Sequence, residues 1–448
     1  MMRRELSLVL FTLLVAAVRG VLPTLQQKEP NHDVMPRPAS GFGREIADCG
    51  RFLPYSSDPN HLWNRVHRRL FERRDAHGVA WGCDEVDPLL WGESHHILAN
   101  PAYAETIRLL DEFTTTHAEQ LIRDPLARGV FQSDLWAVFE WLARSADDHQ
   151  GERAELERRL AAIMKAVALT PLEIQRLPDN YSQLRGKTTD DGLVLPDPAG
   201  GWLLVGRDDA TPVAPFHSSF FTRSLFLVFL KLPTGGPEPS KYLESMRIFS
   251  RQRPHDNPCQ FHACGEPQFP VGTELALVRR ALLIDAAGQL VASPITESVQ
   301  LRRYSRIPPG ANFDFDNSTQ QVAEFQITRR PLAQGVLGLR RVGEDETHFS
   351  VFMMAYQADR FENSFGNSTG AKILPGCHDC HQGIGVRSFT SYSRMQMQPD
   401  HFFVLLRSST EAQEAAVAIA YLQTSNEWML WKRMRGGSSP GSLPHYHR

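Results

Sequence analysis

Apolar and polar positions repeat with two different periods along this chain of 448 residues, and the change of period divides it into regions. Between residues 58 and 180, apolar side chains recur three or four positions apart, which is the spacing of one face of an α-helix. Leu62, Val66 and Leu70 begin this pattern directly after Pro59, a residue that suits the first position of a helix. We therefore predict a helical domain, similar to a bundle, over residues 58–180.

Between residues 188 and 360 the pattern changes to short apolar or alternating runs, separated by Gly, Pro, Asn and Asp. Such runs are typical of β-strands, and residues 285–288 have the composition of a hairpin turn. The expected strands cover residues 202–205, 225–232, 274–284, 290–304, 321–328 and 348–356. We predict a mainly antiparallel sheet or sandwich, which together with the helical region gives an α+β fold.

The first 20 residues have the pattern of a secretory signal peptide. Arg3 and Arg4 precede an apolar run over residues 6–18, and small residues lead to a cleavage position after Gly20. The run is shorter than the roughly 20 residues that a membrane span needs, although an uncleaved anchor is the alternative. We expect an exported protein with no stable membrane span, and an extended arm rich in Pro and Gly over residues 21–57.

The overall charge excludes one class of partner. The chain has 48 Lys and Arg against 51 Asp and Glu, a net charge of −3, whereas nucleic-acid binding calls for a basic face. The sequence also contains no Gly-rich phosphate loop, no G-x-S-x-G nucleophile motif and no H-E-x-x-H zinc motif. The sequence motif that indicates a chemical function is therefore a different one.

That motif is Cys377-His378-Asp379-Cys380-His381, a C-x-x-C-H sequence that is the attachment signature of c-type haem. Cysteines three positions apart lie on one side of a helical turn, where each thiol can add across a haem vinyl group. The imidazole at the next position can then ligate the iron. The alternatives are a disulfide or thiol pair that precedes a histidine, and one half of a zinc site.

At Cys377, Cys380 and His381 the chain resembles the c-type cytochromes. The resemblance covers these five positions strictly and residues 361–448 loosely, as a C-terminal cytochrome c-like haem-binding segment. It implies one covalent haem c, held by thioether bonds from both cysteines and ligated on the proximal side by His381. We expect Pro375 and Gly376 to interrupt the helix before the motif.

The family usually has a Met ligand downstream of the motif, which makes Met429 a candidate distal ligand. Met395, Met397 and His401 are further candidates, and an open sixth position is the remaining one. Met429 stands between Trp428 and Leu430, so core packing on the last helix is its other interpretation.

Three hypotheses on function follow. The first is an exported monohaem c-type cytochrome-like protein of the bacterial periplasm or cell envelope, which exchanges single electrons with a redox partner protein. The second is a haem-dependent peroxidase or oxidase with an open sixth position, in which Arg387 and His401 act on the distal side of the haem and the partner is a small-molecule substrate. The third is an exported binding or structural protein without haem, in which Cys377 and Cys380 form a short disulfide.

The other four cysteines are Cys49, Cys83, Cys259 and Cys264. In an exported chain an even number of remaining cysteines indicates two disulfides, for which three connectivities exist. Proximity along the chain favours Cys49–Cys83 and Cys259–Cys264.

Overall fold

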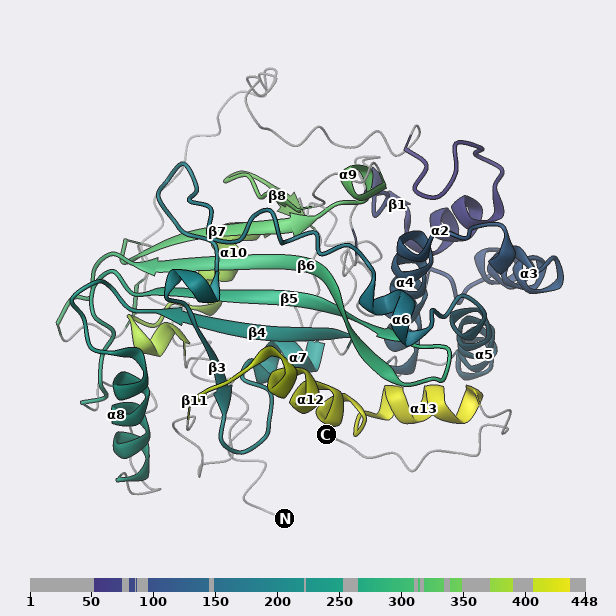
Figure 1. The fold of residues 1–448 in the computed structure, drawn as a ribbon. Coiled ribbons are helices and arrows are strands. Elements are labelled where there is room, and N and C mark those ends of the chain that lie inside the picture. The colour runs from purple at the N-terminus through teal and green to yellow at the C-terminus, as the bar shows by residue number, and fades with distance from the viewer. Residues whose placement is uncertain are drawn as a thin grey trace, which may run out of the picture. The chain divides into compact units, whose positions relative to one another are not determined.

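A computed structural model shows the fold of the chain (Figure 1), and all its described residues belong to one compact unit over residues 44–448. The predicted α+β fold is confirmed, because helices combine with an antiparallel sheet. The signal sequence, most of the expected arm and the expected strand over residues 349–356 lie outside the described residues. The structure describes residues 52–74, 80–84, 86, 96–144, 149–220, 223–252, 265–309, 313–314, 318–333, 339–348, 371–389 and 406–435.

The N-terminal part is helical, as its apolar spacing predicts. Its helices are α2 (Leu62–Phe71), α3 (Ala102–Thr115), α4 (Pro125–Arg144), α5 (Gln150–Ala166) and α6 (Pro171–Gln175). Helix α4 is buried on almost every side from Gly129 to Leu142, because α2, α5 and α13 (Asn426–Arg435) pack around it. The short helix α6 begins at a capping box, in which Thr170 accepts from the Glu173 backbone and Glu173 accepts from the Thr170 backbone.

Seven of the described strands form one antiparallel sheet in the order β11-β3-β4-β5-β6-β7-β8. The long strands at its centre are joined by the predicted hairpin turn, where Gly288 donates to the Asp285 carbonyl and has a positive φ of 76°. The strands are β3 (Leu203–Arg207), β4 (Ser224–Lys231), β5 (Glu274–Ile284), β6 (Leu290–Tyr304), β7 (Gln320–Ile327), β8 (Leu339–Arg341) and β11 (Leu406–Ser408).

Both faces of the sheet are covered, as β4 shows. Leu227 belongs to the large core that includes the N-terminal helices, whereas its neighbour Val228 belongs to a second core on the other face. Successive strand residues point to opposite faces, so this division follows from the period of two. The second core also includes Tyr304 and Val386, and it borders the pocket described below.

The C-terminal region is built into the same unit. Helix α10 (Ile373–Cys380) contacts β7, β11 pairs with β3, α12 (Glu411–Leu422) contacts β4, and α13 packs on α4 and α5. The expectation that Pro375 and Gly376 interrupt the helix is wrong, because α10 runs through both. Pro375 is the third residue of α10, and a first-turn N–H has no partner within its helix, so its loss is tolerated.

Among the described residues no helix has the length and apolar character to cross a bilayer.

Cys83 is buried and disulfide-bonded. Cys49, Cys259 and Cys264 lie outside the described residues, so the connectivity of the disulfides stays a prediction.

Candidate functional site

The C-x-x-C-H motif lies at the C-terminal end of α10, with Cys377 in the last turn and His381 directly after the helix. Two neighbouring strands hold this end in place. Arg302 of β6 donates to the Cys377 carbonyl at 3.0 Å, and the Cys377 thiol donates to the carboxyl group of Glu324 of β7 at 3.4 Å. Burial raises the pKa of Glu324 above its ordinary value. The motif is therefore fixed against the sheet.

His381 is oriented by a hydrogen bond from its own ring. Nδ1 of His381 lies 2.8 Å from the backbone oxygen of Ser388. Because a carbonyl only accepts, Nδ1 carries the proton in the neutral ring, and Nε2 is then the nitrogen with a lone pair for a metal. A hydrogen bond of this kind on the second nitrogen is usual for metal-ligating histidines.

The turn after His381 brings Ser388 back to the ring. Gly383 lies so close to the following turn that a Cβ atom would stand 2.6 Å from the backbone carbon of Arg387 and 2.8 Å from the Ser388 nitrogen. Gln320 closes the arrangement, since its amide donates to the His381 carbonyl at 3.0 Å and accepts from the Ser388 hydroxyl at 3.2 Å. A glycine at position 383 is therefore a requirement of the site.

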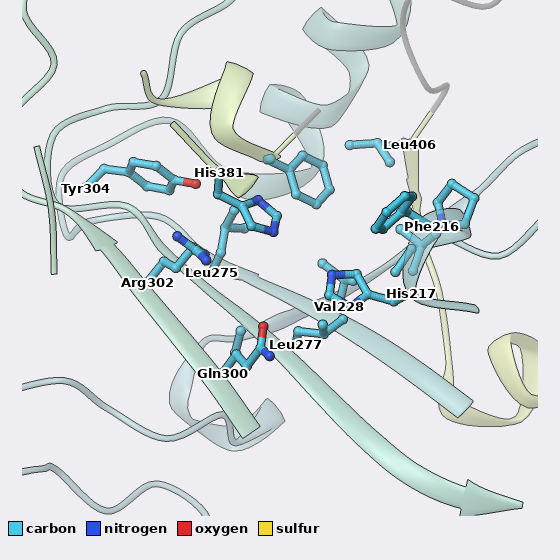
Figure 2. A pocket seen from close by; sticks show the side chains of 15 residues that line it. Phe216, His217, Val228, Leu275, Leu277, Gln300, Arg302, Tyr304, His381 and Leu406 are labelled. Atoms are coloured by element: carbon cyan, nitrogen blue, oxygen red, sulfur yellow. The ribbon is translucent and has the colours of Figure 1, made fainter. Parts of the chain in front are cut away.

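His381 lines a pocket of about 750 Å³, part of which is open to solvent (Figure 2). The polar side chains in its wall include Gln300, Arg302 and Tyr304. Most of the wall is apolar and includes Val213, Val228, Leu275, Leu277, Phe389 and Leu406. Such a wall suits a mostly apolar group.

A second histidine stands across the pocket from the first. His217 lies in α7 (Pro215–Phe220), and its ring centroid is 6.3 Å from that of His381, with 20° between the ring planes. Figure 2 shows the two rings reaching into the pocket towards each other. The ring of Phe226 on β4 supports His217 from the side, at 5.5 Å between centroids.

Both imidazoles are neutral at neutral pH. Burial lowers the pKa of His217 to about 4, and the nearby positive charge of Arg302 acts in the same direction. Burial also lowers the pKa of His381 well below its ordinary value, again with help from Arg302. Neutral imidazole is the form that binds metals.

The structure does not bring the other sequence candidates into this pocket wall. Met429 lies on α13 with 43% of its surface exposed, and it is not among the pocket residues. Arg387 is buried and ion-paired with Glu266, also outside the lining. His378 of the motif is buried with Nε2 3.4 Å from a carboxylate oxygen of Asp314.

Met395, Met397 and His401 lie outside the described residues.

The sequence alone does not identify His217, because Pro215-Phe216-His217 matches no ligand motif and the number of residues between His217 and the C-x-x-C-H motif follows no family rule. No local signal could have identified it. The sheet brings it to His381, since α7 contacts β4 and α10 contacts β7.

The residues present fit a haem better than a metal ion held by side chains alone. Within the described ranges, no group of three or more His, Cys, Asp and Glu side chains could hold a metal ion. A porphyrin supplies four nitrogen ligands itself, so one or two histidines complete the coordination of its iron.

The chain matches no protein-family model, and neither the curated proteins nor the solved structures contain a significant match to it.

Proposed function

We propose that this chain is an exported monohaem c-type cytochrome-like protein that binds one haem c covalently and transfers single electrons. Cys377 and Cys380 would form the thioether bonds, and His381 would be the proximal ligand. When bound, the haem supplies a one-electron couple at its iron. The observation that carries the proposal is the orientation of His381, whose Nδ1 is held by the Ser388 carbonyl while its ring reaches into an apolar pocket.

The chain's own residues would tune the site in two ways. The apolar wall of the pocket would lower the polarity around the iron, which affects its reduction potential. Arg302 places a positive charge in the same wall, and a nearby positive charge favours the reduced iron, which carries less charge. Both features would therefore act on the reduction potential of the iron.

The test is covalent haem attachment in the protein expressed together with a bacterial haem-maturation system. After denaturing electrophoresis, the wild-type band should stain for haem. Cys377→Ser and Cys380→Ser should each lower the staining per polypeptide, and the double variant should lose it. Met429→Ala is the matched control, because this side chain is exposed on α13 and should leave the staining unchanged.

A redox titration of the stained protein should then show one reversible one-electron step. An exported, folded wild-type protein that does not stain would contradict the proposal. Equal staining of the wild type and the double cysteine variant would contradict it as well, because haem bound in that way would not depend on the motif.

A further inference from the structure

We propose that His217 is the second axial ligand of the haem iron, so that His381 and His217 form a bis-histidine site. The inference rests on the proposed function and adds to it the ligand on the distal side. The evidence for it is the distance and angle between the two rings, one from His217 in α7 and one from His381, which directly follows α10.

The separation of the rings is that of two imidazoles on one metal ion. With metal–nitrogen bonds of about 2 Å, two imidazoles bound from opposite sides have ring centroids about 6 Å apart. The observed distance between the centroids of His217 and His381 is 6.3 Å. Both rings reach into the pocket towards each other (Figure 2). An iron ion between the two rings would be held by His381 and His217, and the apolar pocket wall would contact the porphyrin.

The surroundings favour haem iron over a bare metal ion at this place. A zinc site takes four ligands from the protein or from water, and the described residues provide no third metal-binding side chain beside the two histidines. Val228 and Leu275 belong to the pocket wall, where a porphyrin would find apolar contacts.

The orientation of the rings makes a spectroscopic prediction. The planes of the two imidazoles are 20° apart, which is nearly parallel. Nearly parallel axial imidazoles give ferric haem a rhombic low-spin electron paramagnetic resonance signal, whereas perpendicular ones give a strongly axial signal. The wild-type ferric protein should therefore be low-spin with a rhombic signal. Its reduced form should bind carbon monoxide poorly, because the sixth position is taken.

The experiment compares holoproteins that carry substitutions at position 217. His217→Gly should keep the covalent haem, lose the low-spin signal, become high-spin and bind carbon monoxide on reduction. Added imidazole should restore the low-spin signal, because it can replace the missing ring. His217→Met should remain six-coordinate with a higher reduction potential, since Met/His ligation raises the potential. His61→Ala, which removes a half-buried imidazole outside the pocket, is the control and should match the wild type.

Haem staining of each variant separates this inference from the proposed function. A His217→Gly protein that stains for covalent haem and keeps the wild-type low-spin spectrum would overturn the inference and leave the covalent haem intact. A wild-type protein that stains but is high-spin would do the same. Absence of stain in the wild type would overturn the proposed function itself, and the inference with it.

Discussion

The geometry of the site requires a glycine at position 383. Its missing side chain lets the turn after His381 close, and this closure places the Ser388 carbonyl on Nδ1 of the ring. The atoms that a Cβ would meet belong to the backbone, which cannot rotate away as a flexible side chain can. The orientation of His381 therefore depends on the absence of a side chain at position 383.

Gly383→Ala should disturb this orientation. We expect a loss of roughly 1–3 kcal/mol in the free energy of unfolding, typical of overpacking a close contact, and a weaker bond between His381 and the iron. Part of the ferric protein should become high-spin, and the haem content per polypeptide should fall. Absorption spectra and denaturant unfolding measure the two effects.

Gly151→Ala is the matched control for Gly383→Ala. A Cβ at position 151 meets nothing within 4 Å, and the residue lies in the first turn of α5. This variant should keep the wild-type spectrum and stability, or gain slightly in stability. If Gly383→Ala behaves in the same way, the close turn does not set the orientation of His381.

At the scale of elements, α5 buries an acidic residue together with its apolar face. Glu157 is 4% exposed, beside the buried Leu156 and Leu160, and burial raises its pKa to about 7. Its pKa in the unfolded chain is near the ordinary 4.5. Between these values the folded protein binds more protons than the unfolded one, so stability falls as the pH rises through this window.

Glu157→Gln should remove this part of the pH dependence. The wild type should lose up to roughly 3 kcal/mol in the free energy of unfolding between about pH 5 and pH 8, and the variant should lose less. Denaturant unfolding at the two pH values gives the difference. The control is Glu152→Gln, which changes a partly exposed side chain on the same helix and should keep the wild-type dependence of stability on pH. Equal slopes for the wild type and Glu157→Gln would show that Glu157 is ionised throughout.

Elements with a strong local signal were predicted well. The strand expected over residues 274–284 is β5 (Glu274–Ile284), and the capping box at Thr170 begins α6 as its residues require. The predicted helix break at Pro375 is wrong, because a proline breaks a helix only in its interior and is tolerated in the first turn, where Pro375 lies. The sequence gives no clear signal for the first residue of α10, so it does not show whether Pro375 lies in the first turn or in the interior of the helix.

At the scale of the whole molecule, the regions that the sequence separates share one core. Trp428 and Trp431 of α13 are buried, and the ring of Trp428 lies 6.2 Å from that of Trp136 in α4. The sequence predicts an apolar stripe on each helix and gives no information on which stripes meet. The C-terminal region, for which the sequence predicts a cytochrome c-like segment, adds β11 to the sheet and α13 to the helices.

The same reasoning explains what was found at the site. Cys377, Cys380 and His381 are candidates from the sequence alone, because the motif spans only five residues, and the structure places His381 in the pocket wall. His217 is not a candidate from the sequence, because only the folded sheet brings it to 6.3 Å from His381. Met429 followed a spacing typical of a family, whereas in this fold its helix packs on α4 and α5.

The intact mass of the denatured protein tests the central claim most directly. Coexpressed with a haem-maturation system and stripped of non-covalent ligands, the chain should be heavier than its polypeptide by about 616 Da, the mass of one haem. The gain should map to the peptide that contains Cys377 and Cys380. A mass without this gain, with the two cysteines of that peptide joined in a disulfide that removes about 2 Da, would contradict the account.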